Sequence, residues 1–136
     1  MDNKFYVSYE AARLLKEKGY KEDVSRYYDE DGFLHFLEYD ENYNYFQMSN
    51  NDLDLDHYAA PTKAEAIDWL ESKGIIVELN YDDRTHMDNA RWEYFIYTHD
   101  KDGWLKAMVC SRTKNNYYKI RLEAEEAAII KALELL

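Results

Sequence analysis

The spacing of apolar residues along the chain predicts three amphipathic helices. The first runs to Lys18, with Ser8 as its N-cap and Gly19 just past its end. The second covers residues 63–73 and opens with a Thr-x-x-Glu capping box. The third covers residues 122–136, where acidic side chains lie in the first turns, as the helix dipole favours.

Alternation of apolar and polar residues predicts strands between these helices. The predicted strands cover residues 24–28, 33–39, 75–79, 91–98 and 104–112. A glycine-containing turn joins the first two strands and another joins the last two, so both pairs are expected to be antiparallel hairpins. The element order is α-β-β-α-β-β-β-α, which predicts an α+β fold with three helices and a mostly antiparallel sheet of four to five strands.

The chain length of 136 residues fits one globular domain, so we expect residues 1–136 to share one core. The three tryptophans are expected in that core or at its border. A region at about 40–60 is rich in Asp, Asn and Tyr and shows no sustained period. Loops of this length are uncommon in compact domains and are often functional. The aromatic residues favour an ordered loop or an irregular strand pair over disorder.

Charge is distributed very unevenly along the chain. The formal net charge is −11, and residues 27–62, the acidic tract, contain nine acidic residues and no Lys or Arg. Nine aromatic residues lie in the same tract. Acidic groups steer basic partners and tyrosines supply rigid contact area, so the acidic tract is expected to hold a partner-binding face. Its expected members are Tyr39, Asp40, Glu41, Tyr43, Tyr45, Asp52, Asp54, Asp56 and Tyr58.

The composition also restricts the partners and the compartment. The acidic balance argues against direct nucleic-acid binding, which requires clustered Lys and Arg. No apolar run approaches the ~18 residues of a membrane span, and the N-terminus lacks the apolar stretch of a signal peptide. Cys110 is the only cysteine, which excludes an intrachain disulfide and fits a reducing compartment. We expect a cytoplasmic protein that does not bind membranes, and a homodimer stays open.

No motif in the sequence predicts catalysis, a metal site or a cofactor. Residues 52–56 place aspartates at alternate positions, as a calcium loop does, but His57 and Lys63 stand where that loop needs Gly and Glu. The four histidines include no i, i+4 pair, and one cysteine cannot build a thiolate zinc site. We therefore expect no catalytic residue, no structural metal and no cofactor. Weak, adventitious divalent-ion binding at the aspartates stays open.

Three segments resemble one protein family. They read YEAARLLKEKGY, APTKAEAIDWLESKGIIVEL and EAEEAAIIKALELL. They are similar to small uncharacterised proteins common in gut Bacteroides-type genomes, which often lie in prophages and conjugative elements. Here Lys73-Gly74 replaces the basic-His-Gly ending usual in that family. The resemblance carries no catalytic motif, and it implies a mobile-element accessory protein of unknown function.

The sequence thus favours a non-enzymatic interaction module that binds a basic protein surface through the acidic tract. The alternative is a DNA-mimic inhibitor of a nuclease or restriction enzyme, in which carboxylates stand in for phosphates. Mimicry needs carboxylates spread along an extended surface, whereas here they are concentrated in one tract, so it ranks second. A small enzyme is the third interpretation.

Overall fold

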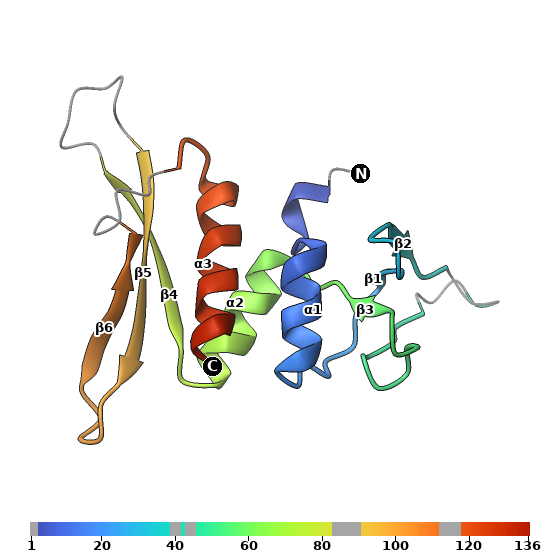
Figure 1. Cartoon of the computed structure of the whole chain (residues 1–136), viewed down its shortest axis with the longest axis horizontal. Helices are drawn as coiled ribbons and strands as arrows, with labels where there is room; N and C mark the ends of the chain where they lie inside the picture. The colour runs from blue at the N-terminus through green and yellow to red at the C-terminus, as the bar shows by residue number, and fades with distance from the viewer. Residues whose placement is uncertain (1–2, 39–41, 43–45, 83–90, 112–117) are drawn as a thin grey trace. The chain divides into compact units, whose positions relative to one another are not determined.

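The computed structural model describes residues 3–38, 42, 46–82, 91–111 and 118–136, which form an α+β fold (Figure 1). The elements are η1 (Asn3–Phe5), α1 (Tyr9–Glu17), β1 (Arg26–Tyr28), β2 (Leu34–Phe36), β3 (Tyr58–Ala59), α2 (Lys63–Ser72), β4 (Ile76–Asp82), β5 (Arg91–His99), β6 (Leu105–Cys110) and α3 (Arg121–Leu135). The α+β class and the three predicted α-helices are confirmed. Within the described residues, none of the helices has the length and apolarity needed to cross a bilayer.

The expectation of one sheet with four to five strands was wrong. The described strands form two three-stranded antiparallel sheets, with the orders β2-β1-β3 and β4-β5-β6. The added strand is β3, which pairs with β1 through Tyr27↔Ala59 and Tyr28↔Tyr58. A strand of two residues is too short to show any alternation, and this pairing joins positions far apart in the sequence. β3 is therefore the third strand of the first sheet, on the side of β1 opposite to β2.

The described contacts gather into two compact units, Met1–Glu65 and Ala66–Leu136. The single-domain expectation stays a prediction, and each unit is described by itself.

In the first unit, α1 packs against the sheet through β3. Its N-terminus is capped as predicted, because the Ser8 hydroxyl accepts a hydrogen bond from the Ala11 N–H at 3.1 Å. Leu15 of α1 is fully buried. The Tyr28 hydroxyl of β1 donates a hydrogen bond to the Val7 carbonyl at 2.6 Å. The β1–β2 hairpin forms across the predicted turn, with Gly32 at a φ of 85°.

The predicted capping box opens α2. The Glu65 N–H donates to the Thr62 hydroxyl at 3.1 Å, and the Glu65 carboxylate accepts from the Thr62 N–H at 3.1 Å. The Thr62 hydroxyl also donates to that carboxylate at 2.8 Å. Two N–H groups that the helix itself cannot pair are thereby satisfied.

In the second unit, α3 packs on β4 and β5. Ile96, Ile129 and Leu133 are fully buried in this core. The central strand β5 pairs with β4 on one side and with β6 on the other, so the second predicted hairpin is confirmed. A register shift between Ile96 and Tyr97 marks a bulge opposite β6. On the β6 side, the chain also returns to β5 through the Trp92↔Tyr118 bridge.

Candidate functional site

Within the described part of the acidic tract, all the acidic residues except Glu38 lie on two segments of the first unit. One is the turn Asp29–Gly32, here called the acidic turn; the other is the segment Asp52–His57, here called the acidic loop. Among the expected partner-binding residues, Asp52, Asp54 and Asp56 lie on the acidic loop and Tyr58 follows it. The expected residues that lie outside the described part of the chain are Tyr39, Asp40, Glu41, Tyr43 and Tyr45.

A lysine of α1 fixes the backbone of the acidic loop. The Lys16 ammonium donates to the carbonyl oxygens of Asp54, Leu55 and His57 at 2.8, 3.2 and 2.7 Å. An ammonium has three donors, so these carbonyls use all of them. Burial lowers the pKa of Lys16, while the nearby Asp56 and Asp54 carboxylates oppose that shift. The Lys16 ammonium on α1 therefore fixes the backbone of the acidic loop.

The side chains of the loop divide into two groups. Asp54 and Asp56 are exposed, with 82% of the Asp54 side chain accessible, and Leu55 between them is 93% exposed. Asp52 is exposed as well, but its carboxylate accepts hydrogen bonds from the N–H and the hydroxyl of Ser49, both at 3.1 Å. The aspartates thus do not converge on one point as they would in a calcium loop. The loop presents one apolar side chain between two carboxylates.

A buried amide anchors the segment that carries the loop. The Asn50 side chain donates to the Tyr20 carbonyl at 2.9 Å and accepts from the Ala59 N–H at 2.8 Å. Asn50 is itself only 7% exposed. Its two hydrogen bonds tie the start of the loop to the chain after α1 and to β3, so the loop is fixed at both ends.

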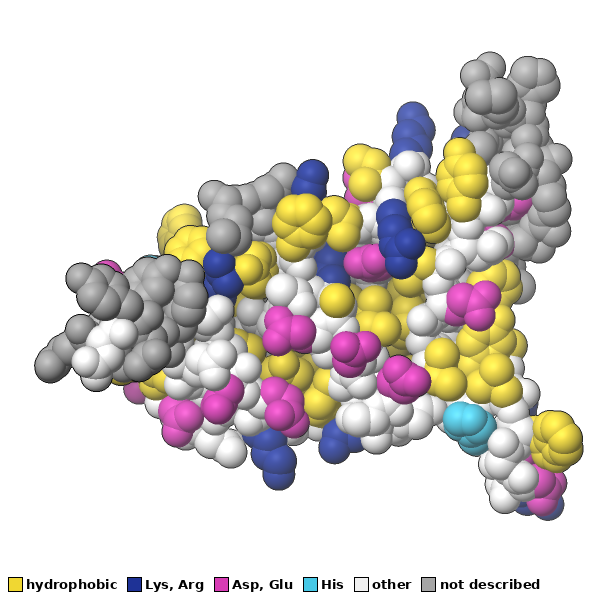
Figure 2. Space-filling model, turned by 180° about the vertical axis from the view of Figure 1, so that it is seen from behind, with side chains coloured by type: hydrophobic (Ala, Val, Ile, Leu, Met, Phe, Trp, Pro, Cys, Tyr) yellow, Lys and Arg dark blue, Asp and Glu magenta, His cyan; other side chains and the backbone are white. Residues whose placement is uncertain are grey.

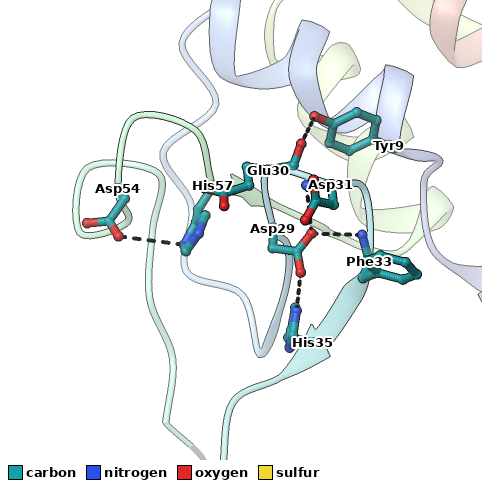
Figure 3. A network of polar contacts seen from close by, with 8 residues as sticks. All are labelled: Tyr9, Asp29, Glu30, Asp31, Phe33, His35, Asp54 and His57. Carbon is teal, nitrogen blue, oxygen red and sulfur yellow. Dashed lines mark hydrogen bonds and ion pairs between the residues drawn. The ribbon is translucent and has the colours of Figure 1, made fainter.

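The acidic turn is organised by one of its own carboxylates (Figure 3). Asp29 accepts from the backbone N–H groups of Asp31 and Phe33 at 2.9 and 3.0 Å. Its other oxygen lies 2.6 Å from the His35 ring. The hydrogen bond with His35, followed by that with the Phe33 N–H, lowers the pKa of Asp29. The hydroxyl of Tyr9 on α1 donates to the Glu30 carbonyl at 3.2 Å, which ties the turn to the helix.

The acidic turn and the acidic loop meet at their exposed carboxylates. A hydrogen bond with Asp56 raises the pKa of Glu30, because two carboxyl groups this close cannot easily both be ionised. The Tyr27 ring stacks on the rings of His35 and His57, with centroid distances of 5.1 and 5.3 Å. Residues of the turn, of β1 and of the loop therefore form one polar surface.

A divalent cation could be held by one group in the described part of the chain. The ligand atoms of Glu30, Asp56 and His57 all lie within 4.8 Å of one another. Both carboxylates are exposed, so water can satisfy them, and nothing else in their surroundings points to an ion. The expectation of no structural metal stays a prediction.

Sequence reasoning missed the residues that support the loop. Lys16 and Asn50 carry no local signal, because their partners lie 38 to 41 and 9 to 30 positions away. Leu55 could have been noticed as a lone apolar residue between aspartates. Tyr58 was expected to face a partner, and its half-buried ring contacts Tyr9 edge-on at 5.6 Å, with the Lys16 ammonium 5.2 Å from its centre.

Comparisons with known proteins identify no relative. No family model matches the chain, and neither the curated proteins nor the solved structures contain a match.

Proposed function

We propose that this protein is a non-enzymatic interaction module whose acidic loop binds a basic protein surface. The proposal extends to its setting: a cytoplasmic accessory protein of a mobile element or prophage. The resemblance of the helical segments motivates that setting, and the single cysteine fits a reducing compartment.

One observation carries the proposal: the acidic loop is ordered by buried or half-buried groups, yet it exposes an apolar side chain. A loop that only increased solubility would need neither the Lys16 contacts nor the Asn50 anchor. Leu55, which is 93% exposed between the two aspartates, adds an apolar side chain that a partner could bury. Burying one leucine against a partner contributes roughly 1.5–3 kcal/mol, enough to anchor a contact that charges orient.

The carboxylates beside Leu55 define the partner's chemistry. Asp54 and Asp56 flank it, and Glu30 lies beside Asp56, so a partner surface needs Lys or Arg around an apolar recess. Preorganisation lowers the entropy lost on binding, because the loop backbone is already fixed.

The test compares two pairs of substitutions with the same change in charge. We expect D54N/D56N to weaken binding to an immobilised peptide rich in Lys, Arg and Leu by about fivefold to tenfold. The control pair E17Q/E22Q changes two exposed acids outside the acidic tract and should have little effect. Leu55→Ser should mainly speed dissociation. Equal weakening by both pairs would mean that only net charge matters, and the proposal would fail.

The DNA-mimic interpretation keeps second place, because the described exposed acids of the acidic tract, apart from Glu38, lie on one turn and one loop and do not follow an extended surface. A mimic should compete with duplex DNA for a nuclease, and D54N/D56N should reduce that competition.

A further inference from the structure

The second unit carries a surface of opposite character to the acidic loop. Residues 104–122 contain five basic residues and no Asp or Glu, in a chain whose net charge is −11. Three of these basic residues are described, and all three are exposed: Lys106, Lys119 and Arg121. The surface formed by β6 and residues 118–121 is here called the basic edge.

The basic edge follows the outer side of one sheet. In the described residues β6 is the outermost strand, and Tyr118 pairs with the same side of β5 further along. Lys106 lies opposite Thr98, and Tyr118 lies opposite Trp92. Six positions along a strand span roughly 20 Å, so the described basic residues lie towards the two ends of an elongated edge, Lys106 at one end and Lys119 and Arg121 at the other.

Apolar side chains accompany this positive charge. Trp104, Leu105 and Met108 are 74%, 55% and 50% exposed. The expectation that Trp104 lies in the core or at its border was wrong, because it stands at the end of the hairpin turn, beyond the cover of α3. Figure 2 shows hydrophobic side chains at the surface of the molecule as seen from behind. Exposed tryptophan is typical of interface anchors.

We propose that the basic edge binds the acidic loop of a second copy of this chain. This inference rests on the proposed function, since it names the basic partner of the loop. The complementarity is both electrostatic and apolar: Asp54 and Asp56 would face Lys106, and Leu55 would pack beside Trp104. Between residues 27 and 62 there is no basic residue, and between 104 and 122 no acidic one, so the two segments are complementary in charge. Acids also lie next to the basic edge: Asp100 accepts a hydrogen bond from the Trp104 N–H, and Glu125 pairs with Arg121. Lys106 is therefore the cation of the edge on which the contact depends most.

Each copy carries both surfaces, so a single head-to-tail contact is heterologous, whereas reciprocal exchange between two copies gives an isologous dimer. Two chains can exchange it reciprocally and close, or further chains can extend it. One loop resting on one strand edge falls short of the roughly 800 Å² per partner typical of a stable interface. Reciprocal exchange doubles the buried area, so a closed dimer in equilibrium with monomer is the expected assembly.

Charge reversal at one position on each surface tests this assignment. The mass of the full chain is measured by analytical ultracentrifugation over roughly a hundredfold range of concentration, because association obeys mass action. The wild type should shift from monomer to dimer as concentration rises. D54K alone and K106E alone should stay monomeric, and mixing the two variants should restore association. The chain with both reversals should also associate again, since each reversed charge then meets its complement. Thermal melts of each variant show that the fold is retained.

Three results would overturn the inference. The wild type stays monomeric at every concentration, D54K alone still forms the wild-type dimer, or the mixture of variants fails to associate. A monomeric wild type is also the result expected if the acidic loop contacts the basic edge of its own chain, or if the basic edge binds a different acidic partner. If the wild type is monomeric and D54N/D56N still weakens binding to the basic peptide selectively, the proposed function stands and only the second-copy assignment fails. If the peptide experiment fails as well, both fail.

Discussion

Replacing Lys16 by Met should destabilise the first unit by loosening the acidic loop. The substitution keeps most of the apolar stem and removes the ammonium that three loop carbonyls share. A direct comparison comes from Lys21→Met, which removes the same charge from an exposed site.

The magnitude follows from how exposed each hydrogen bond is. A hydrogen bond to a charged group contributes about 1.5–3 kcal/mol when its partner cannot be replaced. The bonds to Asp54 and Leu55 are exposed, so water can replace the ammonium there, whereas the bond to His57 is partly buried. The desolvation that lowers the pKa of Lys16 opposes part of this gain. We expect a net loss of about 1–2 kcal/mol in the free energy of unfolding.

Urea denaturation measures this loss. With a slope of about 2 kcal/mol per molar urea, the midpoint of K16M should fall by about 0.5–1 M. The amide of His57, which donates to the Asp54 carbonyl at 3.0 Å, should also exchange its hydrogen faster. If K16M and K21M have the same midpoint and the same exchange rate, the ammonium does not hold the loop and the reasoning is refuted.

Three further changes have defined outcomes. Thr62→Ala should lower the free energy of unfolding by roughly 1 kcal/mol through loss of the capping box, and an unchanged urea midpoint would contradict this. Asn50→Leu should cost more, about 2–4 kcal/mol, because it leaves the Tyr20 carbonyl and the Ala59 N–H without their partner; a smaller loss in the same melts would count against it. His35→Ala should raise the pKa of Asp29 in an NMR titration. Because the pKa of Asp29 is lowered in the folded state, its carboxylate stabilises the fold at pH values above the unfolded pKa, and this stabilisation is lost as the pH falls through the folded pKa. The free energies of unfolding of wild type and H35A should therefore converge in acid.

The helices and hairpins could be predicted because their signals are local. A Ser or Thr cap, a glycine with positive φ and alternating apolar residues all act within a few positions. The Ser8 cap, the Thr62–Glu65 box and the turn at Gly32 each confirm this. Helix ends differed from the prediction by one residue, as expected where the last turn frays.

The division into two sheets could not be predicted in the same way. Pairing of β3 with β1 joins residues 30 and 32 positions apart, and no propensity encodes that choice. The contacts between Lys16 and the acidic loop could not be predicted either, because a lysine on an amphipathic helix usually extends into water. The uneven charge could be read from the sequence, but it does not indicate which residues order the acidic loop.

The acids of the tract have different roles, and this limits which of them can steer a partner. Asp29 and Asp52 use their carboxylates to accept hydrogen bonds from neighbouring N–H groups, so their charge already stabilises the turn and the loop. Asp54 and Asp56 accept none from backbone N–H groups among the hydrogen bonds described for the loop, and both extend from a backbone held by Lys16. Structural carboxylates allow the tract to fold despite its charge, and the exposed pair retains the charge for a partner. A surface that only repelled other proteins would need the second kind of acid but not the first.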